Sequence, residues 1–92
     1  MDKHEAAAVL DQHLASFVRR PYVELAGIIN QPQTARATGP SGAEYQIEFN
    51  VFCDDSHKKE DLRIIGSIDD GGLRSLIPLT KTEIMKSTGE LV

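Results

Sequence analysis

The sequence has few of the residues that carry covalent or redox chemistry. Its 92 residues include a single cysteine, Cys53, and no tryptophan. One cysteine excludes a disulfide within the chain and is typical of a reducing compartment. Apolar runs of the roughly 20 residues that a membrane-spanning helix needs are lacking, and Met1–Leu14 carries acidic side chains where a signal peptide has an apolar segment. We therefore expect a cytoplasmic protein without a membrane partner.

A basic surface is lacking as well. The formal net charge is −4, with 4 basic and 5 acidic side chains in residues 1–46 and 6 basic and 9 acidic in residues 47–92. Proteins that bind nucleic acids usually carry a basic patch, and neither half of the chain provides one. The composition therefore predicts no nucleic-acid partner, and the acidic balance favours solubility and a basic protein partner.

The remaining composition is that of one small globular domain. The hydrophobic fraction is 40% and the charged fraction 26%, both ordinary for a soluble domain. A chain of this length buries roughly 60–65% of its unfolded surface, which is enough for one modest core. The sequence shows no internal repeats or linkers, so residues 1–92 are predicted to form a single domain.

Strict alternation identifies the strongest strand, Ala43–Cys53. Between Tyr45 and Val51, apolar residues occupy every second position and polar residues the others. A period of two is the pattern of a strand with one buried face. The same argument predicts a strand at Leu62–Asp69, whose inward residues are Leu62, Ile64, Gly66 and Ile68.

Two weaker strands complete the predicted sheet. Gln33–Thr38 alternates small and polar residues, and Leu73–Leu79 follows the run Asp70-Gly71-Gly72. Aspartate before glycine is typical of tight hairpins, which need positive backbone angles. Pro78 has no N–H to donate, so the Leu73–Leu79 strand is expected at a sheet edge or beside a bulge. Antiparallel turns alternate between the ends of a sheet, so this hairpin should share an end with the Gly39–Gly42 turn.

Two helices precede the strands. Apolar residues at three- and four-residue spacings predict an amphipathic helix at residues 3–19, with Asp2 as its N-cap and Glu5 completing a capping box. A proline ends this helix and begins a second, Pro21–Ile29, with Asn30 as its stop. The order of elements predicts an α+β fold, an N-terminal helical hairpin packed on one face of a four-stranded antiparallel meander sheet.

The C-terminal residues leave two questions open. Thr80–Glu83 matches a helix capping box, whereas Thr82–Met85 is equally compatible with a short strand that turns at Ser87–Gly89. It is also open whether this tail, residues 81–92, covers the outer face of the sheet.

The polar loop Asp54–Asp61 contains possible metal ligands. Carboxylates and the imidazole of His57 are ligand types, but their spacing matches no calcium-loop motif. Lys58 and Lys59 lie in the middle of the loop and would repel a cation. The sequence therefore predicts a solvated loop, with no metal and no cofactor.

Other reactive side chains receive structural interpretations. Asp69 and Asp70 precede glycines, as a turn requires, so a role in acid–base chemistry is the less favoured interpretation. Cys53 has no adjacent base or helix end to activate its thiol and is expected to be a half-buried structural residue. His13 lies in the apolar stripe of the first helix, without a partner ligand at helical spacing, and should pack at the core margin. No catalytic residue is predicted.

The outer face of the predicted sheet mixes apolar and charged side chains. If the helices cover the opposite face, Phe52 and Ile65 lie here among polar neighbours. Apolar anchors within a polar rim are typical of protein interfaces. The candidate protein-binding residues are Glu48, Asn50, Phe52, Arg63, Ile65 and Arg74, with Leu76 as a further candidate.

These observations favour a small non-enzymatic protein-binding module, such as an inhibitor, an immunity-type protein or a regulatory partner. The alternative is a small-molecule-binding or weakly catalytic domain, with a cleft between helices and sheet near Asp69, Asp70 and Tyr45. A third hypothesis is a subunit that associates through its sheet edges, because open edges pair readily. The expected partner is therefore another protein or a second copy of the chain.

Two runs of residues resemble a known group of sequences. They are GPSGAEYQIEFNVF, Gly39–Phe52, and GSIDDGGLRSLIPLT, Gly66–Thr80. In these runs the chain resembles a small uncharacterised bacterial α+β domain family of unknown function, over about residues 22–80. Such sequences often carry aromatic residues at the positions of Cys53 and Leu73, which implies no fixed role for either. The resemblance implies no activity.

Overall fold

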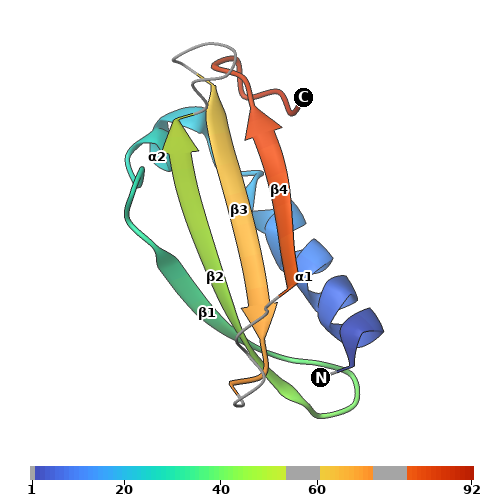
Figure 1. Cartoon of the computed structure of the whole chain (residues 1–92). Helices are drawn as coiled ribbons and strands as arrows, with labels where there is room; N and C mark the ends of the chain where they lie inside the picture. The colour runs from blue at the N-terminus through green and yellow to red at the C-terminus, as the bar shows by residue number, and fades with distance from the viewer. Residues whose placement is uncertain (1, 54–60, 72–78) are drawn as a thin grey trace.

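Figure 1 shows a four-stranded antiparallel sheet with a long helix behind it. The computed structural model describes residues 2–53, 61–71 and 79–92. Its elements are α1 (Lys3–Phe17), α2 (Tyr22–Ala26), β1 (Gln33–Thr38), β2 (Glu44–Cys53), β3 (Leu62–Asp69) and β4 (Leu79–Met85). The strands lie in the order β1-β2-β3-β4, and α1 packs on one face, called the inner face below. This arrangement confirms the predicted α+β meander with its N-terminal helical cover.

The first helix forms as its sequence predicts. The carboxylate of Asp2 caps it by accepting hydrogen bonds from the backbone N–H groups of His4 and Glu5, at 3.0 and 3.1 Å. The helix ends at Phe17, two residues before the predicted end. His13 is half-buried, with Nδ1 2.9 Å from the carbonyl oxygen of Val9, which confirms its place at the core margin.

The second helix is shorter than predicted, because the sheet takes up its last residues. Pro21 lies just before α2, as its N-cap, and Gly27 follows as its C-cap. Ile29 forms a parallel bridge with Val51, and the N–H of Asn30 donates to the Val51 carbonyl at 2.9 Å. Asn30 has φ 61°, a left-handed geometry that turns the chain toward β1.

The core lies between α1 and the inner face of the sheet. The rings of Phe17 and Phe49 stack there with centroids 4.3 Å apart. The inward positions of β2 and β3 follow the predicted alternation, and both strands have nearly the predicted bounds. The buried hydrophobic residues are Ala6, Val9, Leu10, Leu14, Phe17, Leu25, Tyr45, Ile47, Phe49, Val51, Leu62, Ile64, Ile68 and Met85.

The fourth strand of the structure shares only Leu79 with the predicted strand Leu73–Leu79, whose other residues lie outside the described part of the chain. It begins at Leu79, where the predicted strand Leu73–Leu79 ends, and it runs to Met85 as the partner of β3. Of the predicted tight hairpin Asp70-Gly71-Gly72, Gly72 lies outside the described residues, and Gly71 has φ 75°, the positive angle that such a turn needs. Arg74, Leu76 and Pro78 lie outside the described residues. Between the two open alternatives for the tail, the strand is the correct one.

The C-terminal residues turn back along β4. Met85 forms an antiparallel bridge with Leu91, and the N–H of Val92 donates to the Ile84 carbonyl at 2.8 Å. This places the tail at the β4 edge of the sheet, and the side chains of Leu14 and Leu91 line a common hollow beside α1. The tail therefore does not cover the outer face of β2 and β3.

The ends of the sheet are arranged as predicted. The Gly39–Gly42 turn and Gly71 lie at one end, and Cys53 and Asp61 lie at the other. Gly42 has φ 90°, which a glycine adopts freely. In the described part of the chain, no helix is long and apolar enough to cross a membrane.

Candidate functional site

The strand register divides the outer face into an apolar and a polar end. At one end Phe52 lies opposite Arg63, which lies opposite Ile84. In the next row Ile65 lies between Asn50 and Thr82. We call Phe52, Ile65 and Ile84 the apolar end, since the three side chains come from neighbouring strands and share one face.

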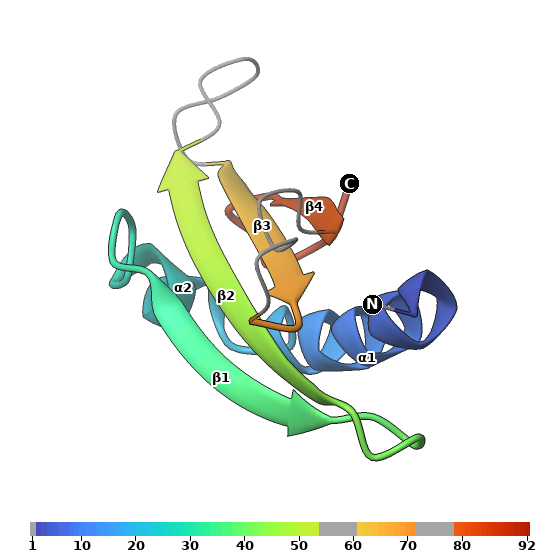
Figure 2. The same cartoon turned by 60° about the horizontal axis from the view of Figure 1, so that its bottom comes forward.

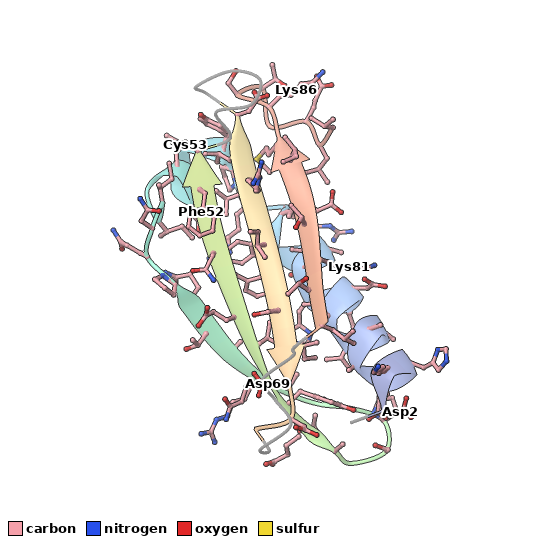
Figure 3. The ribbon with its side chains drawn as sticks, in the orientation of Figure 1. Asp2, Phe52, Cys53, Asp69, Lys81 and Lys86 are labelled. Atoms are coloured by element: carbon pink, nitrogen blue, oxygen red, sulfur yellow. The ribbon has the colours of Figure 1, made fainter. Side chains whose placement is uncertain are left out.

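The apolar end is accessible. The side chain of Phe52 is 37% exposed, although it is among the largest apolar groups of the chain. Ile65 and Ile84 are half-buried by their neighbours, and Arg63 between them is exposed. Figure 3 shows the Phe52 side chain on the face of the sheet turned away from α1. No described segment lies over this part of the sheet.

The polar end lies toward the Gly39–Gly42 turn. Here Arg36 lies opposite Gln46, which lies opposite Asp69. A shallow groove of about 470 Å³ runs along these strands, lined by Thr34, Ala35, Arg36, Gln46, Ile47, Glu48 and Asp69. Its lining carries both charge signs, and the amide of Asn50 donates to the Glu48 carboxylate at 2.8 Å.

Most of the predicted site residues share this face. Glu48, Asn50, Phe52, Arg63 and Ile65 lie together on neighbouring positions of β2 and β3. Arg74, the sixth predicted residue, is outside the described part of the chain.

Sequence reasoning missed two residues of the same face. Ile84 was missed because the fourth strand was predicted before Thr80. Arg36 was assigned to a strand, but its place beside Asp69 requires the register across β2. The alternation along β1 places Arg36 on the outer face. The alternation along Thr82–Met85 does the same for Ile84, so both could have been found from the sequence.

The residues of the alternative small-molecule site point in different directions. Asp69 lies in the outer-face row of Gln46. The hydroxyl of Tyr45 instead points to the helix side, where it donates to the Glu5 carboxylate at 2.7 Å. Asp69 and Tyr45 therefore do not line one cleft between helix and sheet. Tyr45 and Asp70 do line a common hollow of about 130 Å³, together with Arg36 and with Glu44 and Gln46 at the start of β2.

Glu5 joins α1 to the first hairpin instead of completing a capping box. Its carboxylate accepts hydrogen bonds from the Tyr45 hydroxyl, from the Ser41 hydroxyl and from the Ser41 N–H, at 2.7, 2.8 and 2.8 Å. These bonds, that of Tyr45 first, lower the pKa of Glu5 below its ordinary value. The bond to Glu5 and the burial of the ring raise the pKa of Tyr45 to about 12. This Glu5–Ser41–Tyr45 tie is structural, because its hydroxyl and N–H donors are used to join α1 to the first hairpin.

The other predicted sites are placed only in part. Within residues 2–53, 61–71 and 79–92, no three His, Cys, Asp or Glu side chains lie together in a way that could hold a metal. The possible ligands in residues 54–60 lie outside those ranges. Cys53 is exposed at the end of β2, whereas the sequence predicted a half-buried residue. It is the last residue of the strand, although its row partner Leu62 is buried in the core.

Comparisons with known proteins give no functional assignment. No protein-family model matches the chain, no curated protein matches it, and no solved structure matches it. The argument for a function therefore depends on the geometry of the outer face.

Proposed function

We propose that this chain is a non-enzymatic protein-binding module whose binding surface is the outer face of the sheet. The observation that carries the proposal is the accessible apolar end, where Phe52, Ile65 and Ile84 lie on three neighbouring strands. Single exposed apolar side chains are normal on protein surfaces, and three on one open sheet face, around the exposed Arg63, favour an interface.

The residues around the apolar end fit this proposal. Arg63 lies between Phe52 and Ile84, and Asn50 lies beside Ile65. Aromatic residues and arginine are enriched at the centre of protein interfaces, and polar side chains form the rim. The polar end supplies the rim through Glu48. The surface therefore has an aromatic centre and a charged border.

The experiment compares binding with stability. The double change Phe52→Ser and Ile65→Ser removes the apolar groups, and interface anchors of this kind typically cost about 2 kcal/mol or more of binding free energy on truncation. We expect a partner that co-purifies with the wild-type chain to be lost, while the melting temperature changes little. Retention of every partner by the double variant would contradict the proposal. A stable dimer that the wild type and the double variant form equally well would contradict it too.

Val23 provides the matched control. It is 79% exposed on α2, outside the strands that form the apolar end, and is the most exposed large apolar side chain among the described residues. Val23→Ser removes a comparable exposed apolar group and should leave binding unchanged. A partner lost by this variant and the double variant alike would indicate unspecific hydrophobic capture.

A second candidate function is the binding of a small polar molecule in the groove near Asp69. Its volume of about 470 Å³ is within the range of small-molecule sites, roughly 300–1,000 Å³. Such sites are usually concave and mostly apolar, whereas this groove is shallow and carries Arg36, Glu48 and Asp69. Protein binding is therefore the better supported proposal. Asp69→Asn should abolish small-molecule binding and leave the partner of the apolar end bound.

A further inference from the structure

The two edges of the sheet are protected to different degrees. At β4, the tail pairs with the end of the strand through the Met85–Leu91 bridge, and Lys81 forms an ion pair with Asp11 of α1. At β1, the only described pairing partner is β2. β1 contains no proline and no lysine in its run QTARAT, and its single charge, Arg36, points to the outer face. Proline and inward-pointing charges are among the devices with which natural proteins blunt an open edge.

The register identifies which backbone groups of β1 point away from the sheet. The N–H of Gly39 donates to the carbonyl of Ala43, its direct partner, at 2.8 Å. In an antiparallel ladder, hydrogen-bonded pairs alternate with pairs that are not hydrogen-bonded. Ala37 and Ala35 are therefore bonded to β2. The N–H and C=O groups that point outward are those of Thr34, Arg36 and Thr38.

Both sides of this edge include exposed residues, Ala35 on the inner side and Thr34 and Arg36 on the outer side. α1 packs against β3 and β4, toward the other edge of the sheet, so β1 lies to one side of this helix (Figures 1 and 2). Ala35 faces inward yet is exposed, and Ala37 is half-buried. On the outer side, the groove lined by Arg36, Glu48 and Asp69 begins at β1. An added strand would place alternate side chains against the two alanines and along the groove.

The charge on β1 argues against a second copy of the chain as the added strand. In the fully overlapping antiparallel register, Thr34 of one copy faces Thr38 of the other. Arg36 of one copy then lies directly opposite Arg36 of the other. Like charges directly opposite each other are destabilising. A shift by two residues instead brings Pro32 or Pro40, which have no N–H, against the outward groups.

We infer that the β1 edge binds an extended segment of a partner protein as an added antiparallel strand. Its backbone pairs with Thr34, Arg36 and Thr38. Its side chains alternate, with apolar groups toward Ala35 and Ala37 and an acidic group opposite Arg36. This surface is separate from the apolar end at Phe52, so the inference does not depend on the function proposed above. The two surfaces can also serve one partner.

The test uses a library of random ten-residue peptides, displayed on phage and selected against the full chain. We expect enriched peptides with alternating apolar residues and an acidic residue. Their binding should slow amide hydrogen exchange at Thr34, Arg36 and Thr38. Thr34→Pro should weaken a selected peptide by about tenfold or more, because it removes one outward donor and places a ring at the edge. The β1–β2 ladder does not use this N–H, so the fold is retained.

Two matched variants control the test. Thr34→Ala keeps the backbone donor and should bind as the wild type does. Arg36→Glu should reject the acidic peptide and bind the same peptide with lysine at the acidic position. Far-ultraviolet circular dichroism and the melting temperature show whether each variant is folded.

Three results would overturn the inference. One is a selection that enriches no peptide, and another is a bound peptide that slows exchange around Phe52 and Ile65 but not at the β1 edge. That second result would leave the function proposed for the apolar end intact. The third is a dimer of the chain alone in which Thr34, Arg36 and Thr38 are already protected, which would assign the edge to a second copy.

Discussion

Ile64 and Ile65 are neighbours in β3 with the same side chain and different surroundings. Ile64 is fully buried at 0% exposure, in the core formed with α1. Ile65 points to the outer face, where it is half-buried between Asn50 and Thr82. An apolar residue in this sheet therefore contributes to folding on one face and is accessible to a partner on the other. The position of α1 decides which role it has.

The two faces also differ in what completes them. The inner face is complete, because the apolar stripe of α1 covers it and aromatic rings stack within it. The outer face is without a cover in the described part of the chain. The same substitution should therefore have a large effect on stability on one face and a small effect on the other.

The largest effect is expected for Ile64→Ala. This change removes buried methyl and methylene groups from a site that cannot fully collapse, and it should lower the free energy of unfolding by about 3 kcal/mol. Urea denaturation followed by circular dichroism measures the change. A loss below about 1 kcal/mol would mean that α1 does not pack on β3 as described.

A smaller effect is expected for Gly66→Ala, which tests the closeness of α1 to the sheet. A Cβ at this position would lie 3.1 Å from Cδ1 of Leu10 and 3.3 Å from Cε1 of Phe49. Both side chains must shift to admit it, which should cost about 1–2 kcal/mol of unfolding free energy. The double variant with Leu10→Ala creates space for the methyl group. The two changes should therefore be less than additive, and strict additivity would contradict the close approach.

Ile65→Ala should cost less again, about 1 kcal/mol or less of unfolding free energy, because the side chain is only half-buried. It is the counterpart of Ile64→Ala on the outer face. The useful measurement is the ratio between the two losses in the same urea experiment. Equal losses would mean that the outer face is covered in solution and that the binding surface lies elsewhere.

The strands were predicted best where the side chains of their two faces differ most in hydrophobicity. In β2 the inward residues Tyr45 to Val51 are all apolar, and the structure buries them. In β4 the inward positions include Lys81 and Glu83 besides the core residue Met85, because the middle of this edge strand lies beside Asp11 of α1, with which Lys81 forms an ion pair. The period of two is therefore absent from its hydrophobicity. For this reason a strand beginning at Leu79 was not predicted.

The candidate surface was predictable only where it depends on alternation. The side of Phe52 and Ile65 follows from counting along a single strand. The outward backbone groups of Thr34 and Arg36 instead follow from the pairing at Gly39, which is a property of the turn geometry. The contact of Glu5 with Tyr45 joins residues far apart in the sequence. A local rule instead assigned Glu5 to the capping box at the start of α1.

The smallest effect at neutral pH is expected where the Glu5–Ser41–Tyr45 tie closes one end of the inner face. Its contribution should depend on pH in two directions. The folded chain holds the pKa of Glu5 below the ordinary 4.5, so the stabilisation is present above that value and is lost as the pH falls through the folded pKa. The pKa of Tyr45 is raised from 10.0 to about 12. Its stabilisation is present below pH 10 and is lost as the pH rises toward 12.

Glu5→Gln tests this dependence, because glutamine keeps the shape of the side chain and cannot ionise. We expect the variant to be less stable than the wild type at pH 7 and the difference to shrink as the pH falls below 4.5, where Glu5 of the wild type takes up a proton. Urea denaturation at a series of pH values measures the difference. Tyr45→Phe is the matched variant at alkaline pH, and the wild type should lose its advantage over it between pH 10 and 12. A difference that is constant across the acidic range would show that the carboxylate does not hold α1 to the first hairpin. α1 would then not be held at this end of the inner face, which would be accessible as the outer face is.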